Sequence, residues 1–187
     1  SGRSVTTTRG TLRQSGTTRL ELMAAFGDLS ESSAHDYEIV IEPPDIPPPE
    51  ECLERSGEQQ GVDLVINNRV EMRRSPPDPE NTSQPKAEVS GWIRLVDGRD
   101  PDVLSLVLFA DAFPPPIFSY VGRVGWVPTI EFTAHIRKRP EPGWVQGKFW
   151  TEDLRDGRMI ETGLLWDSKG DLVAQSRQLA MFLPMEN

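Results

Sequence analysis

Hydrophobic and polar residues alternate along most of the chain from residue 62 onward. An alternation with a period of two is typical of β-strands that have one buried and one exposed face. The pattern predicts strands at 62–72, 87–96, 129–137, 144–153, 158–167 and 171–183. Turn-forming pairs separate several of these strands, including Asp97-Gly98 and Asp156-Gly157.

Residues 101–112 follow a different pattern, because Ser105 is the only polar residue in their central stretch. This composition predicts a helix of about three turns, with Asp100 as its cap and Pro101 as its first residue. Three prolines at 114–116 prevent the helix from continuing. Since the helix is apolar nearly all round, we expect other elements to cover it on most sides.

The N-terminal part of the chain reads as a β-hairpin, with strands at 5–14 and 17–26 joined at Ser15-Gly16. Tyr37 to Ile41 suggests a short extended piece. The proline- and acid-rich residues 42–61 predict an extended linker, in which Cys52 faces solvent.

The order of these elements predicts an α+β hot-dog fold for residues 62–187. Two strands, one helix and a four-strand meander form an antiparallel sheet that curls around the helix at 101–112. The hairpin at 5–26 resembles the segment 144–167 in length and alternation. Residues 1–41 are therefore expected to be the last strands of a first hot-dog unit, joined by the linker at 42–61 to the second.

Composition narrows the classes of partner. The formal net charge of −9 argues against nucleic acid and anionic membrane surfaces. The single cysteine fits a reducing compartment, and no targeting segment or membrane-length apolar run is visible. We expect a cytoplasmic protein with no membrane partner.

Asp111 is the first candidate for chemistry, because it lies near the C-terminal end of the predicted apolar helix. A buried carboxylate is costly there, and the helix dipole opposes its charge. The alternative is a helix end that reaches solvent. Thr129 opens a strand beside a glycine- and proline-containing break, although threonine is common in strands for its shape alone. Gln178 shares a strand face with Ser176 and Ala180, and a glutamine there is often an ordinary surface residue.

Other kinds of site find little support in the sequence. His35, His135 and Cys52 lack the spacing of a structural zinc site, so no metal is expected. No G-x-S-x-G elbow, credible Cys/His nucleophile or glycine-rich phosphate loop occurs. The five tryptophans are best explained by core packing.

Three stretches carry a resemblance to a known family: LFADAFPPPIF, in which the predicted helix ends, PTIEFTAHIR in the next strand and LVAQSRQLAMFLP near the end. They resemble the thioesterase-like superfamily, specifically acyl-CoA thioesterases of the double hot-dog (thioesterase II) type. The resemblance covers residues 62–184, and the hairpin at 3–29 resembles the end of the family's first unit. It implies that Asp111, Thr129 and Gln178 hold an attacking water.

The resemblance implies an enzyme that hydrolyses acyl-coenzyme A to a fatty acid and coenzyme A, without a cofactor. Arg137, Lys138 and Arg139 are the expected contacts for the coenzyme's nucleotide. The family's first unit opens with a strand, a helix and another strand, so we expect further residues before Ser1. Because hot-dog units pair sheet to sheet, a homo-oligomer is expected.

Two alternatives remain open. A non-catalytic acyl-CoA binding or scaffolding protein could use the same fold, since fold alone does not specify function. A hot-dog dehydratase or hydratase is the weaker alternative, because its usual His/Asp pair has no convincing counterpart in His35 or His135.

Overall fold

The computed structural model describes residues 4–29, 37–55, 64–77, 86–122 and 125–184, in two compact units that divide after Glu38. The first unit is an antiparallel hairpin of β1 (Val5–Gln14) and β2 (Thr17–Gly27). Ser15 and Gly16 have positive φ angles of 49° and 78°, as a two-residue hairpin turn requires. The hairpin prediction is confirmed.

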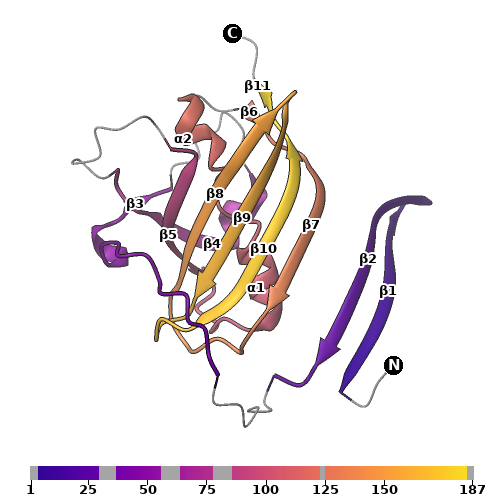
Figure 1. Cartoon of the computed structure of the whole chain (residues 1–187), viewed down its shortest axis with the longest axis horizontal. Helices are drawn as coiled ribbons and strands as arrows, with labels where there is room; N and C mark the ends of the chain where they lie inside the picture. Colours follow the sequence, from indigo (N-terminus) through magenta and orange to yellow (C-terminus); the bar gives the residue numbers. More distant parts are fainter. Residues whose placement is uncertain (1–3, 30–36, 56–63, 78–85, 123–124, 185–187) are drawn as a thin grey trace. The chain divides into compact units, whose positions relative to one another are not determined.

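The second unit is built on a seven-stranded antiparallel sheet with the order β3-β4-β5-β8-β9-β10-β7 (Figure 1). The strands are β3 (Leu53–Glu54), β4 (Val70–Arg74), β5 (Glu88–Leu95), β7 (Thr129–Ile136), β8 (Val145–Arg155), β9 (Arg158–Trp166) and β10 (Leu172–Met181). Of the four strands predicted to form a meander, only β8, β9 and β10 do so. The predicted four-strand meander is wrong in one connection, because β7 pairs with β10 at the sheet edge instead of with β8.

The predicted strand at 62–72 is displaced. Val65–Asn68 forms a 3₁₀ turn (η3), and β4 begins only at Val70. Asn67 and Asn68 favour turns, because their side chains compete for backbone hydrogen bonds. Residues 62 and 63 lie outside the described part of the chain.

The predicted helix is shorter than expected. Helix α1 spans Val103–Phe109, and its cap is Asp102 rather than Asp100. The Asp102 carboxylate accepts hydrogen bonds from the backbone N–H groups of Leu104 and Ser105, and the Ser105 hydroxyl pairs with the Asp102 backbone, which completes a capping box. Leu104 is 76 % exposed, so α1 buries one face and is not covered on most sides.

A second short helix, α2 (Ile117–Val121), was not expected from the sequence. The prolines at 114–116 do end the first helix, but Pro116 has helical backbone angles and starts the second. The strands β6 (Gly125–Trp126) and β11 (Leu183–Pro184) pair with each other in a separate two-stranded sheet. No helix of the described residues is long and apolar enough to cross a membrane.

The core lies between the inner face of the sheet and α1, which Figure 1 shows behind the strands. Leu106 and Phe109 of α1 are fully buried against sheet residues such as Ile93 and Val145. Phe113 stacks on Phe149 with ring centroids 4.6 Å apart. A sheet that packs one face on a single central helix is the predicted hot-dog arrangement.

The proline-rich segment covers the outer face of the sheet, so the prediction of an unpacked linker is wrong for residues 42–55. Three side chains in one cross-strand row, Trp92, Gln146 and Trp166, donate hydrogen bonds to its backbone. The bonds are Trp166 Nε1 to Ile41 O (2.7 Å), Gln146 Nε2 to Pro44 O (2.6 Å) and Trp92 Nε1 to Pro47 O (2.8 Å). Acceptors three residues apart lie on one side of a polyproline II helix, which has three residues per turn.

Cys52 is buried with 7 % exposure, and its thiol donates to Pro47 O, so its predicted exposure to solvent is wrong. It follows the 3₁₀ turn η1 (Pro49–Glu51) and precedes β3, which extends the sheet edge. Residues 56–61 of the predicted linker lie outside the described residues, and 37–41 pair with no strand.

We expect Gly163→Ala to lower the free energy of unfolding by about 1–3 kcal/mol, because overpacking a filled core forces its neighbours to move. A β-carbon at Gly163 would lie 2.3 Å from Phe149 Cε1 and 2.4 Å from Ser176 Oγ. Urea denaturation measures the change. The control is Thr162→Ala on the opposite face, where we expect less than about 1 kcal/mol; equal losses in both variants would contradict the packing argument.

Candidate active site

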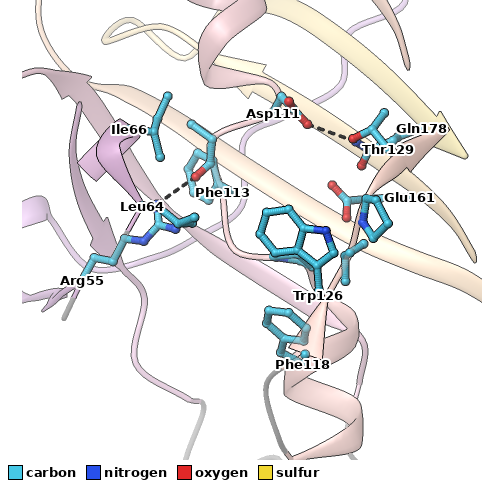
Figure 2. Close-up of a pocket in the computed structure, with 15 residues that line it drawn as sticks. Arg55, Leu64, Ile66, Asp111, Phe113, Phe118, Trp126, Thr129, Glu161 and Gln178 are labelled. Carbon is cyan, nitrogen blue, oxygen red and sulfur yellow. Dashed lines mark hydrogen bonds between the residues drawn. The ribbon is translucent and has the colours of Figure 1, made fainter. Parts of the chain in front are cut away.

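Gln178 connects the two other predicted site residues. Its Nε2 donates hydrogen bonds to Asp111 Oδ1 at 3.0 Å and to Thr129 Oγ1 at 2.5 Å (Figure 2). A carboxylate can only accept, so the amide nitrogen must face Asp111. Both amide hydrogens are thereby used, and the groups left for a ligand are Gln178 Oε1, the second oxygen of Asp111 and the Thr129 hydroxyl hydrogen.

The three residues come from three different parts of the fold. Asp111 lies in the turn directly after α1, whose C-terminal cap is Ala110. Gln178 lies on the inner face of β10 and is 7 % exposed, as the strand parity predicts for the face of Ser176 and Ala180. The alternative of an ordinary surface glutamine is therefore wrong.

A β-bulge brings Thr129 to the same face. Glu131 pairs with Leu179, but Thr129 pairs with Ala180, so Ile130 is the extra residue in β7. Directly opposite residues point to the same side of a sheet, which places Thr129 beside the inward-facing Ala180. Without the bulge, Thr129 would share the outer face with Glu131 and Thr133.

The three residues line a pocket of about 270 Å³, slightly below the usual range for small-molecule sites. Its described lining residues are Arg55, Leu64, Ile66, Asp111, Ala112, Phe113, Pro115, Phe118, Gly125, Trp126, Val127, Pro128, Thr129, Glu161 and Gln178. Asp111 is exposed to solvent, as the alternative of a helix end that reaches solvent expected, yet the surrounding protein still removes part of its hydration. Burial therefore raises the pKa of Asp111, and the hydrogen bond from Gln178 opposes that rise.

Glu161 is a second carboxyl group in the pocket, and it was not among the predicted site residues. It lies on β9 opposite Gln178 and is 9 % exposed. Burial, with a further contribution from the charge of Asp111, raises the pKa of Glu161 to about 8. A signal was present in the sequence, because Glu161 shares its strand face with Met159 and Leu165.

Arg55 was not predicted either. It lies on the far side of the pocket in Figure 2, and its Nη1 donates to Ala112 O at 3.0 Å in the turn that carries Asp111. Burial lowers the pKa of its guanidinium, but an arginine stays charged. No sequence pattern marked it, because it comes from the proline- and acid-rich segment predicted to be unpacked.

The predicted nucleotide contacts do not meet the other site residues. Arg137, Lys138 and Arg139 follow the end of β7 that is opposite to Thr129, roughly 25 Å along the strand. Lys138 is paired with Asp171. Their contact with the coenzyme's nucleotide stays a prediction. His135 is exposed, and His35 lies outside the described residues.

Comparison with known protein families shows which family the chain belongs to. The family described as the acyl-CoA thioesterase C-terminal domain matches residues 44–182, most of the chain. The chain belongs to this thioesterase family. The match includes the proline-rich segment from residue 44 onward, which covers the outer face of the sheet.

Solved structures agree with this thioesterase assignment. A candidate thioesterase II from Thermobifida fusca YX is 32 % identical, with a TM-score of 0.79 over 97 % of this chain and 68 % of its own. A hot-dog protein of unknown function from Alicyclobacillus acidocaldarius has a TM-score of 0.81 at 23 % identity, over 100 % of this chain and 70 % of its own, and shows the fold alone.

Among curated relatives of this thioesterase-family chain, an uncharacterised protein of Mycobacterium tuberculosis is 36 % identical over 84 residues. That segment is 45 % of this chain and 28 % of the mycobacterial protein, so the match spans about a quarter of that relative's length.

Stability should depend on pH through Glu161. The unfolded side chain releases its proton near pH 4.5, whereas the folded one keeps it to about 8. The contribution of Glu161 to the free energy of unfolding is therefore fully present below pH 4.5. It is lost progressively as the pH rises from 4.5 to about 8, because only the unfolded chain releases the proton in that range. We expect Glu161→Gln to remove this fall, which amounts to a few kcal/mol.

The measurement is urea denaturation of both proteins at several pH values. The difference between the two curves isolates Glu161, because all other titrating groups are shared. Parallel pH dependences in the two proteins would contradict the neutral state of Glu161.

Proposed function

We propose that this chain carries the hydrolytic site of an acyl-CoA thioesterase, with Asp111, Thr129 and Gln178 as its catalytic residues. The observation that carries the proposal is the pair of hydrogen bonds from Gln178 Nε2 to Asp111 and Thr129 inside the pocket. Membership of the thioesterase family supplies the reaction class.

In the proposed reaction, a water molecule attacks the thioester carbonyl carbon. The Asp111 carboxylate accepts one proton of this water, and Gln178 Oε1 accepts a hydrogen bond from the other. The Thr129 hydroxyl, whose oxygen already accepts from Gln178, donates its hydrogen to the water oxygen. A C–O bond forms and the C–S bond breaks. The proton taken up by Asp111 passes to the leaving sulfur, so coenzyme A leaves as the thiol, the carboxylic acid is released and the Asp111 carboxylate is regenerated.

Positioning is the main contribution of this arrangement. Groups fixed in the pocket hold the water next to the thioester carbonyl carbon. The entropy cost of bringing the two reactants together is then met on binding and does not add to the reaction barrier. Apolar and aromatic residues such as Phe113, Phe118 and Trp126 line the rest of the pocket and suit an acyl chain or the pantetheine arm. The three proposed catalytic residues and the other described lining residues all belong to the second compact unit.

The domain organisation is part of the proposal. We assign the hairpin to a first hot-dog unit and the compact unit that begins at Ile39 to the second, because the proline-rich segment and β3 pack with the second sheet. The hairpin keeps several large apolar side chains exposed, including Leu20, Met23 and Phe26, which supports a role within a larger sheet assembly. Pairing of hot-dog sheets in a homo-oligomer stays a prediction, as does the cytoplasmic location.

We expect Asp111→Asn to lower kcat by about 10²–10⁴-fold, because an amide cannot accept the proton of the water. Release of the coenzyme thiol from a panel of acyl-CoA chain lengths measures it. Asp97→Asn, an exposed aspartate in the turn after β5, is the control and should match the wild type. Full activity in the Asp111→Asn variant would contradict the proposed role of Asp111 as the base. Binding without turnover by the wild type would favour the acyl-binding alternative.

The pH profile gives an independent check. The Asp111 carboxylate must be ionised to act, so kcat/KM should fall as pH decreases through the pKa of Asp111. Burial moves that midpoint above the ordinary value of 3.8. Initial rates over the acidic range measure it, and a rate that stays constant below 3.8 would contradict the assignment.

A further inference from the structure

Glu161 faces the candidate site from the middle of the sheet. It pairs with Gln178 of β10 on one side and with Thr151 of β8 on the other. Directly opposite residues share one face of the sheet, so Glu161 points inward like Gln178. Figure 2 shows its carboxyl group directed into the pocket that Asp111 and Thr129 also line.

The charges around Glu161 disfavour its ionised form. Asp111, from the turn after α1, is the charged group that acts on it, and it is an acid as well. Arg55 is the cation among the described lining residues of the pocket, and its Nη1 donates a hydrogen bond to Ala112 O. Among the described residues, no hydrogen bond or ion pair reaches the Glu161 carboxyl, although the Glu161 side chain is only 9 % exposed. The neighbouring Thr151 Oγ1 is buried without a hydrogen-bond partner.

Two carboxyl groups in one pocket thus take opposite states. Gln178 donates to Asp111 and so favours the Asp111 carboxylate, whereas Glu161 has no such donor and a pKa of about 8. Near neutral pH, Glu161 therefore keeps its proton, whereas the hydrogen bond from Gln178 favours the charged form of Asp111 and opposes the rise in its pKa that burial causes. A neutral carboxylic acid is a hydrogen-bond donor, which a carboxylate is not.

The reaction needs such a donor. As water attacks, negative charge develops on the carbonyl oxygen of the thioester, and donors aimed at that oxygen are usually the largest single source of acceleration. Both amide hydrogens of Gln178 are already used, and the Thr129 hydroxyl is assigned to the water.

We propose that Glu161 is a further catalytic residue, which in its neutral form donates a hydrogen bond to the thioester carbonyl oxygen. This inference rests on the proposed thioesterase function. The proton stays on Glu161 throughout, so the bonds that form and break are those of the hydrolysis itself. Once Glu161 ionises, its charge repels the developing oxyanion, and the rate should fall on the alkaline side.

The test compares Glu161→Gln and Glu161→Ala by kcat, KM and pH profile on the acyl-CoA substrate that the wild type hydrolyses best. Glutamine keeps a donor but cannot titrate. We expect its kcat/KM to stay within about tenfold of the wild type, without the alkaline fall centred near 8. Alanine removes the donor, so its kcat should drop about 10²–10³-fold with little change in KM.

Two further variants make the result decisive. Glu152→Gln replaces an exposed glutamate of β8 that pairs with Arg177, and it should behave as the wild type does. Asp111→Asn tests the proposed function separately: if it abolishes turnover while Glu161→Ala does not, the hydrolase stands and the Glu161 proposal is overturned.

Other outcomes are equally clear. If Glu161→Gln falls as far as Glu161→Ala, Glu161 transfers a proton instead, for example to the leaving thiolate, and the carbonyl-donor role is overturned. An alkaline fall that persists in Glu161→Gln overturns it as well. If the wild type hydrolyses no acyl-CoA, the proposed function fails first, and this inference fails with it.

Discussion

The candidate site depends on one amide group. Gln178 Nε2 donates hydrogen bonds to both Asp111 and Thr129. Asp111 lies in the turn after α1, and Thr129 lies on the edge strand β7. Neither residue is fixed by its own element alone, because Asp111 follows the end of α1 and Thr129 is the first residue of β7. The buried glutamine therefore sets the distance between them, and the core beneath β10 sets the position of the glutamine. The packing of the sheet on α1 therefore determines the positions of the three side chains in the pocket.

The same sheet supplies a second carboxyl group in a different state. Asp111 and Glu161 line one pocket, yet only Asp111 receives a hydrogen bond from Gln178, and only Glu161 lies nine-tenths buried without a donor among the described residues. Solvation and hydrogen bonding thus separate two acids of similar intrinsic strength into one base and one neutral donor. The two acids differ because Asp111 lies in an exposed turn after α1, whereas Glu161 lies on the inner face of β9.

The outer face shows why a packed segment could not be recognised from composition. Prolines and acids normally indicate an extended, solvated segment. An extended proline-rich segment makes no hydrogen bonds within itself, so its backbone carbonyl groups can accept hydrogen bonds from elsewhere. Here the donors are the side chains of Trp92, Gln146 and Trp166. Those donors lie on β5, β8 and β9, between 45 and 125 residues away in the chain. The segment covers the outer face, buries Trp166 and brings Arg55 to the pocket.

Most of the strands, the turns between them and the apolar helix were predictable from the amino-acid sequence, because each follows from local periodicity and turn chemistry. Strand parity grouped Gln178 with Ser176 and Ala180, but only the tertiary packing showed that this face points inward. Together with the family resemblance, the sequence also brought forward Asp111, Thr129 and Gln178 as a set. The inward direction of Thr129 was not predictable, since strand parity places it outward and the extra residue at Ile130 exists only in the pairing with β10. The neutral state of Glu161 likewise arises from burial and from Asp111, a neighbour far away in the chain, and a local pattern does not encode either.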